Sequence, residues 1–230
     1  MSVGLYILHL YPGADENRQV LLREAAKCVD LVRRKKAEHL KNIPARAACL
    51  GAGMLLQKML LDLQCGVEFS DTVFLEEEEL LAQLQNRTQE EQTSTLTIAY
   101  RYGAHGKPMI ADFPKHFNLS HSGDYVVCAV SDGEVGVDIQ KWVPFKERTA
   151  ERFFAPEEWK LLQTLPMEQR TEMFYRLWTR KEAYGKYTSL GIPDAVRENL
   201  LGEEECAGRQ IRFLEMQPDQ EYSIAVCVNR

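Results

Sequence analysis

The sequence is poor in the features that mark several protein classes. Its six cysteines show no CxxC or CxH spacing, and several stand among apolar residues, as Cys128 and Cys227 do. This pattern predicts buried free thiols rather than a zinc site or a disulfide framework. The N-terminal segment has no basic start, and its apolar run is too short for a signal peptide or a membrane span. We therefore expect a cytoplasmic protein that does not bind membranes.

Basic residues are in the minority. The chain has 28 Lys and Arg against 34 Asp and Glu, a net charge of −6. This balance argues against a nucleic-acid partner, because contacts to phosphates need a basic surface. There is no repeat and no low-complexity segment. At 230 residues, with 45% hydrophobic and 27% charged residues, the chain can fold as one large domain or two smaller ones.

Hydrophobic periodicity predicts a mixture of strands and helices. The predicted strands cover residues 3–10, 96–100, 125–130, 135–139, 211–216 and 222–228. The predicted helices cover residues 16–36, 44–63, a short segment from 76, then 146–154, 156–165 and 167–187. Strands and helices do not alternate regularly, and most turn signals favour antiparallel pairing. The fold class that follows is α+β.

The stretch from 117 to 140 contains the most informative pattern. Asp132-Gly133 lies between two apolar runs, which predicts a β-hairpin. In the second run, Asp138 and Gln140 alternate with valine and isoleucine, so they share one face of a strand. An aspartate at such a position needs a partner such as a cation. The alternative is an aspartate at a strand end that caps the strand or faces water.

A second group of polar residues lies on the predicted helix over 167–187. Glu182 and Lys186 are four residues apart and so lie on the same face, one turn from each other, with Trp178 one turn earlier. The alternative without a functional role is a surface Glu–Lys pair beside a core tryptophan. A basic run at 33–36 is equally open: its residues either complement a helix dipole or form an anion site.

Taken together, these residues favour phosphate chemistry. The sequence offers a strand aspartate, a helix glutamate and several cations near turns, namely Lys107, His121 and Lys186. Mg²⁺ in proteins commonly uses one or two carboxylates and fills its other positions with water and substrate phosphate oxygens.

Four blocks of sequence also resemble a known family. They are GKP (106–108), FNLSHSG (117–123), GVDIQ (136–140) and WTRKEAYGK (178–186). With RFFAPEEW (152–159), they are similar in kind and order to the motifs of 4′-phosphopantetheinyl transferases of the longer, surfactin-type class. The resemblance is strong from Gly103 to Gly191 and weak on either side. It implies a pseudo-twofold pair of similar α+β halves, residues 1–132 and 133–230, each a small, mainly antiparallel sheet packed with helices.

The resemblance also implies roles for individual residues. Coenzyme A would be the co-substrate, lying between the halves, and Mg²⁺ (or Mn²⁺) would be held by Asp138, Glu182 and Gln140. Glu182 would accept the proton of the attacking serine, directly or through a metal-bound water, and Lys186 would contact the pyrophosphate. The residues implied for coenzyme A binding, besides Lys186, are Lys35, Arg46, Lys107, Pro108, Ser120 and His121.

The implied reaction is transfer of 4′-phosphopantetheine from coenzyme A to a serine of an apo acyl or peptidyl carrier protein, with release of 3′,5′-ADP. Gln140 departs from the family pattern, where a second acidic residue is common. Two alternatives therefore stay open: a non-catalytic protein that binds coenzyme A or a carrier, and a generic Mg²⁺-dependent phosphohydrolase. Docking of the carrier would use Arg148, Arg152, Phe153 and Phe154, although core packing also explains the phenylalanines. We expect a monomer.

Overall fold

The computed structural model describes residues 2–13, 15–90, 97–103, 106–145, 147–189, 198–202, 205–206 and 209–230. The chain divides into two compact units that interleave in sequence. Unit 1 comprises residues 1–3, 101–119 and 129–230, and unit 2 comprises residues 4–100 and 120–128. Small, mainly antiparallel sheets are packed with helices, which confirms the predicted α+β class. The pseudo-twofold relation and the division at residue 132 stay predictions.

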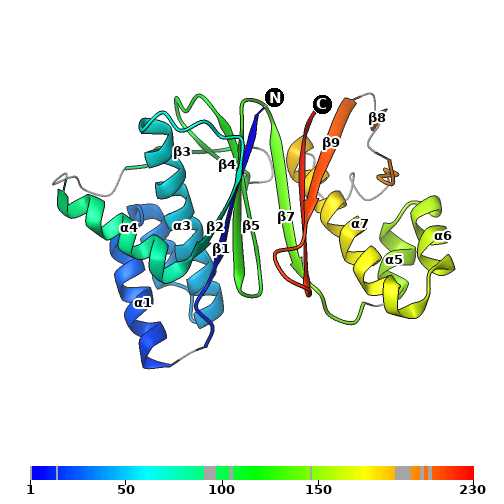
Figure 1. Cartoon of the computed structure of the whole chain (residues 1–230), viewed down its shortest axis with the longest axis horizontal. Coiled ribbons are helices and arrows are strands. Elements are labelled where there is room, and N and C mark those ends of the chain that lie inside the picture. Colours follow the sequence, from blue (N-terminus) through cyan, green and yellow to red (C-terminus); the bar gives the residue numbers. More distant parts are fainter. Residues whose placement is uncertain are drawn as a thin grey trace. The chain divides into compact units, whose positions relative to one another are not determined.

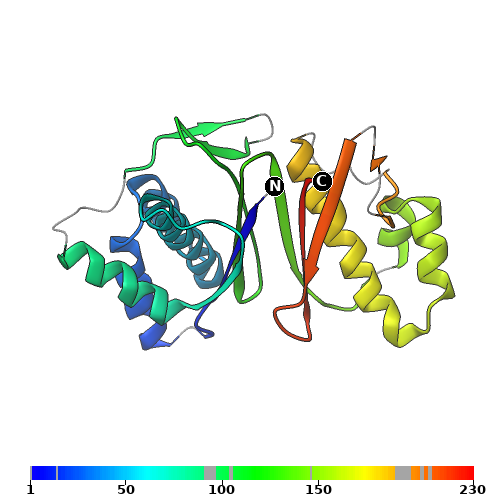
Figure 2. The same cartoon turned by 45° about the horizontal axis from the view of Figure 1, so that its top comes forward.

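Unit 2 is built on a four-stranded sheet in the order β2-β1-β6-β5. Its strands are β1 (Val3–His9), β2 (Thr72–Glu76), β5 (His116–Ser122) and β6 (Tyr125–Ser131). Residue 3 of β1, residues 116–119 of β5 and residues 129–131 of β6 are assigned to unit 1. β1 and β2 run parallel, with Ile7 opposite Phe74, and Gly123 takes a positive φ of 54° between β5 and β6. The helices α1 (Glu16–Lys27), α3 (Ile43–Gln64) and α4 (Glu77–Glu90) lie on one side of this sheet (Figures 1 and 2).

The long helix predicted over residues 16–36 is wrong, because the segment forms two helices, α1 and α2 (Leu31–Glu38). α1 ends at Lys27 with Cys28 as its C-cap, and the carboxylate of Asp30 accepts hydrogen bonds from the N–H groups of Val32 and Arg33. An aspartate that binds the free N–H groups of a new first turn favours a helix start over helix continuation. The basic run therefore lies on a short separate helix, with Lys35 and Lys36 in its last turn.

Local signals predicted the other helices of unit 2 well. Asn42 caps α3 by accepting the N–H of Ala45, and Pro44 lies in the first turn, as expected. α4 begins with three glutamates, as predicted, but it has 14 residues and is not the short helix that was expected. The strand predicted over 96–100 is observed as β3 (Tyr100–Tyr102), which starts at the last residue of the prediction and pairs with β4 (Pro108–Ile110). Residues 91–96 lie outside the described part of the chain.

Unit 1 contains the second four-stranded sheet, in the order β7-β10-β9-β8. Its strands are β7 (Val135–Lys141), β8 (Glu205–Cys206), β9 (Arg209–Met216) and β10 (Tyr222–Asn229). β7 and β10 are antiparallel, with Val137 opposite Val226. The helix α7 (Met167–Thr188) packs against β7 and β10, and α5 (Glu147–Phe153) and α6 (Pro156–Thr164) lie beyond it (Figures 1 and 2).

The hairpin predicted at Asp132-Gly133 is wrong. Strands β6 and β7 lie on either side of this turn, but they belong to different sheets. β7 pairs with β10, a strand that is buried from Tyr222 to Val228 and lies about 80 residues further along the chain. Pairing with this apolar strand buries both partners, so long-range burial overrides the local turn signal.

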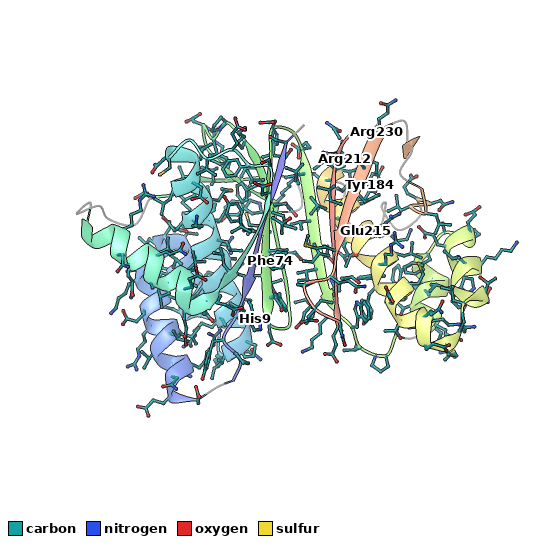
Figure 3. The ribbon with its side chains drawn as sticks, viewed as in Figure 1. His9, Phe74, Tyr184, Arg212, Glu215 and Arg230 are labelled. Carbon is teal, nitrogen blue, oxygen red and sulfur yellow. The ribbon has the colours of Figure 1, made fainter. Side chains whose placement is uncertain are left out.

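Two ion-pair groups join the elements of unit 1. Glu215 on β9 forms ion pairs with Arg180 (2.7 Å) and Arg176 (2.8 Å) on α7, and Figure 3 shows Glu215 on the strand beside this helix. Lys181 on α7 forms a pair with Glu158 on α6 at 2.7 Å, and both side chains are almost completely buried. These contacts hold α7 against the sheet on one side and against α6 on the other.

The described cysteine side chains are free. Cys28, Cys49, Cys128 and Cys227 are buried, as predicted, whereas Cys65 is exposed. Among the described residues, no helix is both long enough and apolar enough to span a bilayer.

Candidate active site

Asp138 is buried in the middle of β7, with 2% of its surface exposed. Lys186 Nζ donates to Asp138 Oδ1 at 2.7 Å, and Gln140 Nε2 donates to Asp138 Oδ2 at 3.0 Å. The carboxylate thus has the cationic partner that the strand pattern required, and the water-facing alternative is wrong. The contact with Gln140 also confirms that both side chains lie on one face of the strand.

The helix α7 supplies Lys186 and Glu182, and it lies unusually close to β7. A methyl group at Gly136 would overlap the carbonyl oxygen of Ala183 and lie 2.5 Å from the amide nitrogen of Tyr187. Only glycine leaves room for this approach of helix backbone to strand backbone. The glycine of the GVDIQ block therefore sets the distance between Asp138 and the residues of the helix.

Glu182 and Asp138 are coupled through their charges. Burial raises the pKa of Glu182 to about 7, the negative charge of Asp138 adds to this rise, and Lys186 opposes it. Glu182 and Lys186 are half-buried rather than exposed, and Lys186 binds Asp138, so they are not simply a surface pair. Trp178 is stacked on Phe174 with ring centroids 5.8 Å apart, as expected for a core tryptophan. The site thus contains the half-buried carboxylate of Glu182 near the buried carboxylate of Asp138.

A divalent cation fits this donor set. In the described part of the chain, no three His, Cys, Asp or Glu side chains converge on one point. The candidate ligands are therefore two carboxylates, Asp138 and Glu182, and the amide group of Gln140, whose nitrogen donates to Asp138. Mg²⁺ and Mn²⁺ favour such oxygen ligands, and Mg²⁺ needs only one or two protein carboxylates. After burial, repulsion from Asp138 is the second cause of the raised pKa of Glu182. A cation bound between the two carboxylates would relieve this repulsion.

Lys107, predicted to contact coenzyme A, also reaches this part of unit 1. Its ammonium group donates to Glu134 Oε2 at 2.9 Å, to the carbonyl oxygen of Val135 at 3.1 Å and to the carbonyl oxygen of Lys186 at 3.1 Å. The side chain therefore joins the start of β7 to the last turn of α7. Pro108 follows as the first residue of β4.

The other residues predicted to bind coenzyme A lie in unit 2. Ser120 and His121 are neighbours on β5; Ser120 is buried and His121 is exposed. Lys35 is exposed in the last turn of α2. Arg46 donates twice to the carbonyl oxygen of Leu40. With Arg23 and Arg34, it lines a pocket of about 260 Å³.

Sequence reasoning missed two residues that shape the site. Asn118 is buried, and its Oδ1 accepts the N–H of Val137, the residue before Asp138. Gly136 permits the close approach of α7. Asn118 lies in the block FNLSHSG and Gly136 in the block GVDIQ, and membership of these blocks was the only sequence feature that pointed to them. The residue types alone do not show that Asn118 binds the strand backbone or that Gly136 admits the helix backbone.

The candidate carrier-docking residues are divided between surface and core. Arg148 and Arg152 are exposed on α5, and the guanidinium of Arg152 lies 5.0 Å from the ring centroid of Phe153. Phe153 is partly buried. Phe154 is buried against Phe174, which confirms core packing for this one of the two phenylalanines.

Comparison with known proteins gives a family for the region that contains β7 and α7. Residues 134–227 match the sequence model of the 4′-phosphopantetheinyl transferase superfamily. "4′-Phosphopantetheinyl transferase psf-1" of Bacillus pumilus is 45% identical over 96 residues, 41% of each chain. A Bacillus subtilis "4′-phosphopantetheinyl transferase" is 36% identical over 140 residues, 56% of this chain and 62% of its own. "4′-Phosphopantetheinyl transferase Sfp" of Bacillus subtilis strain 168 is 38% identical over 96 residues, 41% of this chain and 43% of its own.

These matches span between 41% and 62% of the relatives' lengths. The matched segment includes the three candidate metal ligands, Asp138, Gln140 and Glu182, and also Lys186. The resemblance indicated by the sequence blocks is thus confirmed: residues 134–227 of this chain are similar to the 4′-phosphopantetheinyl transferase superfamily.

Proposed function

We propose that this chain is an enzyme that transfers the 4′-phosphopantetheine group of coenzyme A to a serine of an apo acyl or peptidyl carrier protein, with release of 3′,5′-ADP. One observation carries the proposal: within the segment that matches the superfamily, a buried Asp138 is paired with Lys186 and is electrostatically coupled to Glu182. Carrier proteins of fatty acid, polyketide or nonribosomal peptide synthesis are the substrate class.

The chain's own groups account for the charge movements of this reaction. When bound to Asp138, Glu182 and the amide oxygen of Gln140, Mg²⁺ or Mn²⁺ supplies positive charge to the pyrophosphate. Lys186, held at 2.7 Å from Asp138, presents its ammonium group to the same phosphate oxygens. The serine oxygen forms a bond to the β-phosphorus as the bond between this phosphorus and the bridging oxygen breaks.

Glu182 is the proton acceptor in this scheme. Burial, together with the charge of Asp138, raises the pKa of the Glu182 carboxyl, so its ionised form accepts a proton more readily than an exposed carboxylate does. The proton moves to Glu182, and the negative charge of the departing 3′,5′-ADP remains on the phosphate oxygens beside Lys186. Asp138 keeps Lys186 in place through their 2.7 Å contact.

Binding of coenzyme A requires further cations and a nucleotide surface. By resemblance, Ser120, His121, Lys35 and Arg46 of unit 2 contact phosphate oxygens, and residues 107–108 line the adenine side. The arginines around the pocket of Arg46 support an anion-binding role for this part of unit 2. The exposed Arg148 and Arg152 on α5 suit docking of an acidic carrier, since opposite charges attract at close approach. A monomer, a cytoplasmic location and the absence of nucleic-acid and membrane partners stay predictions.

One feature favours a second candidate function, a non-catalytic protein that binds coenzyme A or a carrier. Gln140 replaces the second carboxylate that is common at this position, and its amide group donates to Asp138. The amide contributes no negative charge, so it weakens the attraction for a metal cation. Asp138, Glu182 and Lys186 are nevertheless all present, and this full set favours the transferase.

The test is to weigh an apo carrier protein by intact mass spectrometry after incubation with the chain, coenzyme A and Mg²⁺. A gain equal to phosphopantetheine, lost with EDTA and in Asp138→Ala and Glu182→Ala, is the expected result. If several carriers gain no mass although coenzyme A binds, the protein is the non-catalytic binder. Absence of binding to both coenzyme A and carrier proteins overturns both functions.

A further inference from the structure

Strand β7 has an open edge. It is the end strand of the sheet β7-β10-β9-β8 in the described part of the chain. The N–H of Val137 donates to Asn118 and not to β10, so the polar backbone groups of Val137 point to this edge. Because these groups alternate in direction along a strand, those of Val135 point the same way, and those of Gly136 and Asp138 point to β10.

Side chains occupy this edge where another strand would otherwise pair. Asn118 accepts the N–H of Val137 at 3.0 Å, and Lys186 donates to the carbonyl oxygen of Val137 at 3.0 Å. Lys107 donates to the carbonyl oxygen of Val135 at 3.1 Å. Asn118 is 4% exposed, and the Lys107 side chain is 12% exposed. Buried backbone groups require such partners, because an unpaired one is costly.

Lys107 also fixes the end of α7. All three donors of its ammonium group have acceptors: the carbonyl oxygens of Val135 and Lys186 and the carboxylate of Glu134. A cation that binds a carbonyl group in the last turn stabilises the C-terminal end of a helix. Lys107 therefore links the strand that carries Asp138 to the helical turn that carries Lys186.

We propose that Lys107 and Asn118 are positioning residues for the transfer reaction. They hold the open edge of β7 and the last turn of α7 so that Asp138, Glu182 and Lys186 keep one relative geometry. Neither side chain contacts the reacting atoms in this scheme. The inference rests on the proposed function, and it differs from the role as a coenzyme A ligand that the resemblance implies for the Lys107 side chain.

The kinetic test compares Asn118→Ala and Lys107→Met with two control variants of unit 1. Lys115→Ala removes another lysine of the same segment, which pairs with Asp132, and Ser131→Ala removes a buried polar group that bonds to the backbone of Ser2. Displacing catalytic groups by about 1 Å can cost about 100-fold in rate, so we expect kcat to fall by about 10- to 100-fold in the test variants. The control variants keep the wild-type kcat.

Binding measurements separate positioning from ligand contact. By calorimetry, the Kd for coenzyme A without metal is expected to stay unchanged in Lys107→Met, whereas Mn²⁺ binds more weakly in Asn118→Ala. If Lys107→Met weakens coenzyme A binding and keeps the wild-type kcat at saturation, Lys107 is a ligand and the proposal is overturned. Lys107→Arg, which keeps the charge and can still donate, is expected to recover part of the lost kcat.

Amide hydrogen exchange provides a readout that does not depend on the reaction. In Asn118→Ala, the Val137 amide should exchange at least about tenfold faster, whereas the Gly136 and Asp138 amides stay protected by β10. Equal acceleration of all three would mean general loosening and would overturn the specific role. If Asn118→Ala does not fold, Asn118→Ser carries the same test. A wild-type chain without transfer activity overturns the proposed function, and the positioning role is then judged by Mn²⁺ affinity and amide exchange alone.

Discussion

Replacing Glu182 by glutamine is predicted to stabilise the protein while it abolishes transfer. The pKa of Glu182 is raised from 4.5 to about 7, first by burial and then by Asp138, and Lys186 only partly offsets this. The ionised form is thus less favourable in the folded state than in the unfolded chain. Glutamine has nearly the same shape and no charge, so it removes the penalty and also the proton acceptor.

The size of this effect depends on pH. Well below pH 4.5, Glu182 is protonated in both states and there is no penalty. Between pH 4.5 and 7 the unfolded chain releases the proton and the folded protein retains it, so the free energy of unfolding falls as pH rises. Above pH 7 the full penalty applies. It is at most about 3 kcal/mol, and screening at this partly buried site reduces it to about 1–2 kcal/mol.

Thermal unfolding measures this penalty directly. For a chain of this length, 1 kcal/mol moves the Tm by about 2–4 °C, so Glu182→Gln should raise the Tm by about 2–8 °C at pH 8 and by much less at pH 5. The control is Glu172→Gln, an exposed glutamate on the same helix, which should change stability by less than about 0.5 kcal/mol at either pH. Mg²⁺ should raise the Tm of the wild type and have less effect on the variant. A Tm gain that is equal at both pH values, or absent at pH 8, would refute the electrostatic reasoning.

Three further substitutions test the surroundings of the site. Gly136→Ala should destabilise the protein by about 3 kcal/mol or more in urea unfolding, because its methyl group would meet the backbone of Ala183, and transfer should fall with it. Lys181→Met should cost about 3–5 kcal/mol, since it leaves Glu158 charged and buried, and adding Glu158→Gln should recover part of this loss. Gln140→Glu should lower the Mg²⁺ concentration that gives half-maximal rate, and an unchanged Mg²⁺ dependence would exclude contact between this position and the metal.

Sequence patterns were sufficient where the deciding interaction is local. The start of α3 was predicted from Pro44, and the shared face of Asp138 and Gln140 followed from strand alternation. The helices α5, α6 and α7 were predicted to within one or two residues of their observed bounds. In each case a cap residue or a periodic apolar face within the segment itself sets the outcome.

The two wrong predictions have different causes. The break at Asp30 was missed because the apolar period continues through it, although an aspartate at a potential N-cap was a visible signal. The hairpin at Asp132-Gly133 could not be corrected from local sequence, because the partner of β7 is decided by the burial of β10. Likewise, the contacts of Lys107 depend on Val135 and Lys186, which its own segment does not reveal.

The arrangement around β7 gives a physical reason why four separate sequence blocks occur together in this chain. GVDIQ is the strand itself, FNLSHSG contributes Asn118, GKP contributes Lys107 and WTRKEAYGK contributes Lys186. Three of the blocks therefore place a side chain on the same open strand edge. An edge covered by another strand would satisfy the backbone equally well, but it would exclude the ammonium group of Lys186 from the carbonyl oxygen of Val137. Leaving β7 at the end of the sheet thus lets one lysine bind both the strand backbone and the carboxylate of Asp138, the arrangement on which the proposed transfer reaction relies.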